Sequence, residues 1–198
     1  MPSGRTHDRI TLWSLPFVAG LTFGQTQSGN LTLIISGGFL FGGLMFGPDL
    51  DIYSRQYQRW GWLRWIWLPY QSSLRHRSFL SHGPLIGTAL RLVYLATWIA
   101  LLAMLASLMT QLFGGVAWNA DAATLAVVRS LAQHQTECFA LYIGLELGAM
   151  SHSLSDWSGS AYKRWRKKLG ISDLGRPPAK IKKRQRKSPS RTPGKSKL

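Results

Sequence analysis

Histidine and aspartate side chains recur in this 198-residue chain at the borders of long apolar stretches. Imidazole and carboxylate groups are ligands for zinc, manganese or iron. The single cysteine, Cys138, has apolar neighbours and is expected to be a buried, inert thiol. The pattern predicts a divalent-metal centre, with zinc as the expected ion and manganese or iron as alternatives. The predicted metal ligands are His7, Asp49, Asp51, His76, His82, His152 and Asp156.

The spacing within each pair indicates how its side chains are presented. His152 and Asp156 are four residues apart, so on a helix both side chains face the same way. Asp49 and Asp51 are two residues apart, and an extended turn would present both carboxylates to one side. The two histidines that bound residues 76–82 follow no helical repeat, so we expect the loop between them to fold back on itself.

Seven candidate ligands exceed the number that one tetrahedral ion needs. One interpretation is a two-metal centre, in which bridged ions activate water and hold an oxyanion, often a phosphoester. Arg77 would stabilise the oxyanion and Asp51 would act as general base, which makes these two the predicted catalytic residues. Asp8 is expected to orient His7. The alternative is a structural metal that joins helix ends and leaves no open coordination position.

The apolar stretches predict the helices that position these residues. Residues 10–48 contain no charged residue, and the polar run 26–30 divides them into halves at 10–24 and 31–46. Glycines in the second half suit the close approach of two helices in lipid. They are Gly37, Gly38, Gly42 and Gly43. A pair of buried helices in a soluble domain is the alternative interpretation.

The second half of the chain carries the most apolar stretch. Residues 92–120 are uncharged and long enough to cross a bilayer. A further helix is expected from near Asp121 to Asp156, with an interruption near His134. Glu146, an acid within an apolar run, should face the interior of the bundle rather than lipid. Together these stretches predict an all-α fold, a four-helix integral membrane bundle.

Residues 53–75 have a different composition, in which arginine alternates with tryptophan and tyrosine. Indole and guanidinium groups favour the lipid headgroup region, so we interpret this stretch as an interfacial segment. A nucleic-acid-binding surface has a similar composition. The apolar stretches on both sides favour lipid.

Positive charge is concentrated at one end of the chain. The net charge is +16, and residues 163–198 hold fifteen of the twenty-four Lys and Arg residues with one acid, a net of +14. Proline and serine interrupt these cations, which is typical of a disordered tail. We therefore expect a helical membrane metal-binding domain at 1–162 and a basic tail at 163–198. The tail would bind anionic lipid, RNA or an acidic protein, or would only orient the chain in the membrane.

The same charges predict a topology. The connecting segments 25–30 and 114–120 contain no Lys or Arg, whereas the N-terminus, residues 53–77 and the tail are basic. By the positive-inside rule, four helices would leave both termini in the cytoplasm. All predicted ligands then fall near helix ends on the cytoplasmic face.

This ordered set of motifs resembles a bacterial family of uncharacterised metal-binding membrane proteins, which is itself similar to the membrane-bound metal-dependent hydrolases. The matching motifs are Thr6-His7, Pro48-Asp49-Leu50-Asp51, His76-Arg77 with Ser81-His82, and His152 with Asp156. Ser78 stands where those relatives have glycine. The resemblance implies a metal-dependent hydrolase of the inner membrane. More distantly, the His/Asp set resembles the zinc-dependent phospholipase C and nuclease type, which implies phosphoester-type substrates at the cytoplasmic face. The alternative is a non-enzymatic, metal-stabilised scaffold whose tail binds lipid, RNA or a partner protein.

Overall fold

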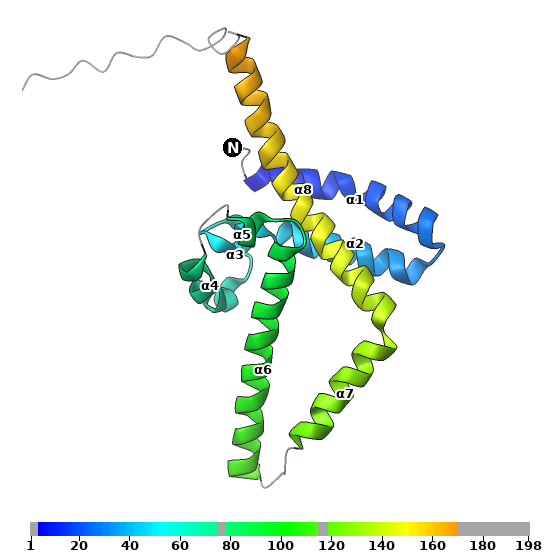
Figure 1. The fold of residues 1–198 in the computed structure, drawn as a ribbon, viewed down its shortest axis with the longest axis vertical. Coiled ribbons are helices and arrows are strands. Elements are labelled where there is room, and N and C mark those ends of the chain that lie inside the picture. The colour runs from blue at the N-terminus through cyan, green and yellow to red at the C-terminus, as the bar shows by residue number, and fades with distance from the viewer. Residues whose placement is uncertain (1–3, 75–77, 115–118, 170–198) are drawn as a thin grey trace, which may run out of the picture. The chain divides into compact units, whose positions relative to one another are not determined.

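A computed structural model describes residues 4–74, 78–114 and 119–169, and every regular element in these ranges is helical. The elements in chain order are α1 (Gly4–Thr26), α2 (Gly29–Leu44), η1 (Pro48–Asp51), α3 (Arg55–Gln58), η2 (Gly61–Trp67), α4 (Leu68–Ser73), α5 (Phe79–His82), α6 (Ile86–Gly114), α7 (Ala120–Gln133) and α8 (Gln135–Lys168) (Figure 1). The chain divides into two compact units, Met1–Tyr162 and Lys163–Leu198. The predicted all-α fold is confirmed for the described part of the chain.

Helices α1 and α2 form a hairpin, drawn in blue and light blue in Figure 1. The polar run predicted to separate them does so: Ser28 caps α2 through its side-chain oxygen, and Gln27 takes a positive φ of 49° in the turn. Towards the other end of the hairpin, Thr11 packs directly on Gly43, where any Cβ would meet the Thr11 side chain. The first turns of α1 therefore lie beside the end of α2, close to η1.

Glycines bring α2 and α8 into backbone contact. They form two pairs with the same four-residue spacing, Gly38 and Gly42 in α2 and Gly144 and Gly148 in α8. A Cβ on Gly42 would lie 3.0 Å from Cα of Leu145 and nearer still to its carbonyl oxygen, which leaves no room for a side chain. The prediction that the α2 glycines permit close helix approach is confirmed, except at Gly37, where a Cβ would meet open space.

The main apolar core is aromatic and lies largely within the segment expected to be interfacial. Trp67 is fully buried, and its ring contacts those of Phe46, Tyr70 and Tyr94 at centroid distances of 5.4 to 5.8 Å. Other side chains of the segment, such as that of Trp62, point outward and are exposed. The interfacial interpretation is therefore incomplete. Short helices divide these aromatic residues between core and surface, and composition alone does not reveal that division.

The C-terminal helices begin and break where predicted, but the predicted end at Asp156 is wrong, because α8 continues to Lys168. α7 ends at Gln133 and α8 begins at Gln135, so the predicted interruption at His134 is confirmed. Glu146 on α8 is buried, and its carboxylate accepts a hydrogen bond of 2.9 Å from the Leu85 backbone N–H. The expectation that this acid faces the helical interior is also confirmed.

Two segments in the described part of the chain are long and apolar enough to cross a membrane, Gly29–Asp51 and Ile86–Phe113. In the first, 44% of the most apolar window is buried, and in the second only 6%. Neither α1 nor α8 meets the same criterion. The helical content is thus established, whereas the predicted integral bundle with four spans is not.

Candidate metal centre

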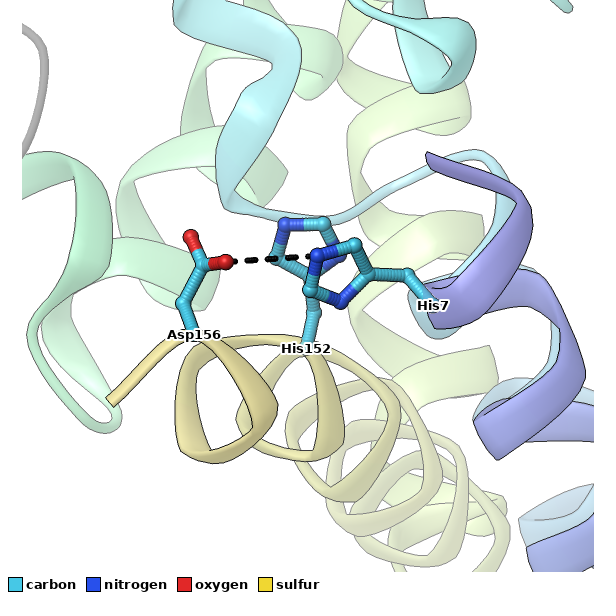
Figure 2. Close-up of side chains that lie close together, drawn as sticks. All are labelled: His7, His152 and Asp156. Carbon is cyan, nitrogen blue, oxygen red and sulfur yellow. Dashed lines mark ion pairs between the residues drawn. The ribbon is translucent and has the colours of Figure 1, made fainter. Parts of the chain in front are cut away.

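Five of the predicted ligands meet at one place, carried by four separate elements. They are His7 on α1, Asp49 on η1, His82 on α5, and His152 and Asp156 on α8. Figure 2 shows the three that lie on α1 and α8. Imidazole Nε2 atoms lie near carboxylate oxygens throughout, at 3.3 Å for His7 and Asp156, 3.1 Å for His152 and Asp49, and 3.7 Å for His82 and Asp49. Asp49 therefore joins two histidines from different helices.

The predicted helical spacing on α8 brings two ligand-type side chains together beside His7. His7, His152 and Asp156 each offer a ligand atom, and these atoms lie within 4.8 Å of one another. The imidazoles of His7 and His152 stack with ring centroids 3.9 Å apart. Metal–ligand bonds of about 2 Å bring ligand atoms closer than this, so small side-chain rotations would let the three surround one ion.

Local hydrogen bonds hold Asp49 in its place. The Gln56 side-chain oxygen accepts from the Asp49 backbone N–H, and its amide nitrogen donates to the Gly43 carbonyl. The Ser54 hydroxyl donates to the Asp49 carbonyl at 2.7 Å. η1 is a 3-10 helix, so the expected extended turn is wrong. Asp49 and Asp51 nevertheless face one imidazole, that of His82.

Several ligand atoms are buried without an aligned hydrogen bond. They are both ring nitrogens of His152 and Oδ1 of Asp156, despite the short distances to Asp49 and His7. A buried polar atom without a well-aligned hydrogen bond costs up to about 1–3 kcal/mol, which a bound cation would offset. The donor set of imidazole nitrogens and carboxylate oxygens fits a divalent metal. These atoms are therefore suited to coordinate an ion.

The protonation of His7 suits the same role. Burial lowers the pKa of His7, and the neighbouring His152 lowers it further, whereas Asp156 and Asp49 act in the opposite direction. The net shift is downward, so the neutral imidazole is favoured, which is the form that binds metal. The Ser155 hydroxyl lies 2.6 Å from His7 Nδ1 and fixes the orientation of the ring.

A small cavity of about 20 Å³ adjoins these ligands. Its lining residues are Gly4, His7, Asp8, Gly43, Asp49, Arg55, Gln56 and His152. A volume of this size admits one water molecule or one ion.

The remaining predicted site residues have different placements. Asp51 is buried, with Oδ2 3.9 Å from His82 Nδ1, at the edge of the cluster. His76 and Arg77 lie outside the described residues. Asp8 does not orient His7; its carboxylate accepts hydrogen bonds from the guanidinium groups of Arg55 and Arg59.

Sequence reasoning did not find two residues that support the site, Ser155 and Gln56. Ser155 lies one turn after His152 and directly before Asp156, so its place on the ligand-bearing turn was a usable signal. Gln56 had no such signal, because its partners are backbone atoms of α2 and η1. Cys138 was predicted to be buried but is exposed, since the first turns of α8 have few packing partners.

The described part of the chain is helical in its regular elements and brings together histidine and aspartate side chains that could hold a metal ion, which defines the class as a helical metal-binding protein. The chain belongs to a family described as "Uncharacterized metal-binding protein" (DUF2227), which matches residues 2–166. This range includes every predicted ligand. The family description names no reaction, so the resemblance to membrane-bound hydrolases stays a prediction.

One relative is an uncharacterized protein from Aquifex aeolicus, 41% identical over 59 residues. The match covers 29% of this chain and 41% of the relative, so the chain spans less than half of the relative's length. No solved structure matches the chain.

Proposed function

We propose that this protein is a membrane protein that binds a divalent metal, and that the metal joins four segments of the chain. One observation carries the proposal: ligand-type side chains from α1, η1, α5 and α8 converge within contact distances of 3.1 to 3.9 Å. The proposed ligands are His7, Asp49, His82, His152 and Asp156, with Asp51 and His76 completing the set.

The charge of the cluster supports a cation. Asp49 and Asp156 are largely withdrawn from solvent, while the neutral form of His7 is favoured. Buried carboxylates without a compensating charge are unfavourable. A divalent ion would supply that charge and bind the neutral imidazoles as well. Zinc is the expected ion because imidazole nitrogens form much of the set; manganese and iron are the alternatives.

The small size of the cavity favours a structural role for the metal. Space for one water molecule or ion lies beside His7, Asp49 and His152, so a metal bound there would occupy most of it. A metal held there would fix the start of α1 against α8 and η1. Such sites contribute directly to folding free energy.

A membrane location is supported by α6. Only 6% of its most apolar window is buried, so in water this helix would expose a long hydrophobic surface. With 28 residues, the span Ile86–Phe113 is more than long enough to cross a bilayer core of about 30 Å. We propose that α1, α2, α6 and α8 form the integral bundle, with the metal centre at the cytoplasmic face of a bacterial inner membrane and both termini in the cytoplasm.

Metal analysis of the detergent-purified full chain tests the proposal. The wild type should contain stoichiometric metal, and His152→Ala and Asp49→Ala should lose it. His134→Ala is the matched control, because His134 is exposed and distant from the cluster in sequence, and this variant should retain the metal. Absence of metal from the wild type after purification and reconstitution with zinc, manganese and iron(II) would overturn the proposal.

Metal-dependent hydrolysis of a phosphoester-type group is the second candidate. The surplus of ligands favours it, together with the water-sized space beside them, because a bound water is what a catalytic metal activates. Asp51 would act as general base and Arg77 would stabilise charge. Hydrolysis of bis(p-nitrophenyl) phosphate by metal-loaded wild type, lost in Arg77→Ala while the metal stays bound, would support this function. Equal background rates in both proteins would refute it for this probe.

A further inference from the structure

His82 lies on an element that cannot hold its own position. α5 spans only Phe79–His82, and one turn of helix is not stable alone. The chain then passes through Gly83 and Leu85 into α6. The place of His82 in the cluster must therefore be fixed by contacts from other elements.

The first such contact comes from Arg91 on α6. Its side chain is 1% exposed, which is unusual for an arginine. One guanidinium nitrogen donates to the Ser81 carbonyl and the other to the Thr88 hydroxyl, each at 2.9 Å. Ser81 is fully buried, and its hydroxyl lies 2.8 Å from Nδ1 of His82. Arg91 thus holds the residue that directly contacts the His82 ring.

The second contact comes from α8 and holds Leu85. The Glu146 carboxylate accepts from the Leu85 N–H, and the Tyr142 hydroxyl donates to the Leu85 carbonyl, both at 2.9 Å. Leu85 has a φ of 62°, a left-handed conformation that non-glycine residues adopt only when their surroundings impose it. Glu146 and Tyr142 of α8 therefore hydrogen-bond to both polar backbone groups of Leu85, the strained residue that leads from His82 into α6.

These contacts share one target. Arg91 and Glu146, although buried in different helices, both hydrogen-bond to the backbone of residues 81–85, and both line a small cavity together with His82. If Arg91 and Glu146 only neutralised each other's charge within the core, neither would need to hydrogen-bond to the segment that carries His82. Residues around metal ligands commonly orient them in this way.

We infer that Arg91, Glu146 and Tyr142 are positioning residues that set His82 in the metal centre and thereby couple α6 and α8 to metal binding. The inference rests on the proposed metal-binding function. None of the three is a ligand in this account. Each acts through the backbone of residues 81–85, so its removal should weaken the metal site without emptying it.

The test measures metal affinity of the detergent-purified full chain by competition with a chromophoric zinc chelator. Arg91→Leu and Glu146→Leu should each weaken zinc binding on the order of ten- to a hundred-fold, as loss of an orienting partner does elsewhere. Glu146→Gln keeps an acceptor for the Leu85 N–H and should bind close to wild type. Ser107→Ala is the control, because Ser107 is a shielded polar residue of α6 that hydrogen-bonds only within its own helix.

A double-mutant cycle separates positioning from general stability. In a His82→Ala background, Arg91→Leu should cause no further loss of affinity, because its effect passes through His82. The cobalt-loaded Glu146→Leu variant should show the altered ligand-field spectrum of a centre lacking one imidazole. Tyr142→Phe removes a single hydrogen bond near the surface and should weaken zinc binding severalfold at unchanged helicity. If the leucine variants do not fold, the zinc affinity of Tyr142→Phe tests the inference by itself.

Wild-type affinity in Tyr142→Phe and in the folded leucine variants would overturn the inference while leaving the metal site intact. Full additivity with His82→Ala would do the same. A wild type that binds none of zinc, manganese and iron(II) would instead overturn the proposed function itself.

Discussion

Replacing Gly42 with alanine should weaken metal binding as well as the fold, although Gly42 is not a ligand. The new Cβ would lie 3.0 Å from Cα of Leu145, whereas ordinary contact begins at 3.4 Å. The Leu145 carbonyl oxygen lies nearer still, and helix backbone cannot rotate away, so α2 and α8 must separate by more than about 0.4 Å. Asp49 follows α2 and His152 lies on α8, so the same separation acts on their contact at 3.1 Å.

The magnitude follows from packing and from metal geometry. Overpacking of this kind costs about 1–3 kcal/mol, and metal–ligand distances tolerate only about 0.2 Å of change. If most of that strain falls on the metal-bound state, zinc affinity should drop roughly ten- to a hundred-fold. Gly37→Ala is the matched control on the same helix, since its Cβ meets open space. Alanine there should be neutral or stabilise by up to about 1 kcal/mol.

The assay compares the thermal midpoint by circular dichroism and the zinc affinity by chelator competition, for both variants and the wild type. Gly42→Ala should fall below the wild type on both measures. If its midpoint and affinity equal those of Gly37→Ala, the backbone contact between α2 and α8 does not position the metal ligands.

Three further outcomes are expected. Removing the metal with a chelator should lower the thermal midpoint of the wild type but not of His152→Ala, because only the wild type has bound-metal stabilisation to lose; equal shifts would contradict the site. In the metal-free protein, the lowered pKa of His7 means that the unfolded chain takes up a proton more readily. The free energy of unfolding should therefore fall as pH decreases below about 6.5, and denaturation at pH 7.5 and 5.5 should show a smaller difference in His7→Gln. Deleting residues 170–198, which leaves α8 intact, should reduce recovery of the protein with anionic vesicles at low salt but not with neutral ones; undiminished anionic binding would show that residues 170–198 are not the lipid-binding element.

Local sequence signals were enough to predict the breaks between the long helices, but not where α1 and α6 begin or where α8 ends. The polar run after α1 and the break at His134 were recognisable because hydrophobic periodicity stops there. The spacing of His152 and Asp156 placed two ligand-type side chains on one turn without any tertiary information. Both kinds of signal depend only on residues that are close together in the sequence.

The partners of long-range polar groups could not be predicted in the same way. Asp8 is next to His7 in sequence, yet its carboxylate pairs with Arg55 and Arg59, because the hairpin of α1 and α2 brings those arginines to it. Arg91 gave no functional signal within its helix, since its target in the Ser81 backbone is set by how α5 folds back on α6. The partners of Asp8 and Arg91 depend on tertiary packing, which a single sequence does not reveal.

One long-range feature was present in the sequence and was overlooked. Gly144 and Gly148 repeat the spacing of Gly38 and Gly42, and two matched pairs of this kind indicate a specific helix contact. Recognising the match would have placed α8 against α2, and with it His152 near Asp49. The glycine contact lets α2 and α8 approach closely, and the metal cluster needs that approach, because it brings Asp49 near His152.

The two sides of the cluster differ in how they are held, and this has a consequence for metal binding. On one side, Gln56 fixes Asp49 through the backbone, and the Asp8 ion pairs fix the start of α1, near the protein surface. On the other side, the buried groups of Arg91 and Glu146 fix the loop that carries His82. Surface ion pairs weaken with salt, whereas buried hydrogen bonds do not. High ionic strength should therefore loosen the α1 side first, so that the contribution of His7 to zinc affinity decreases with salt while that of His82 stays constant.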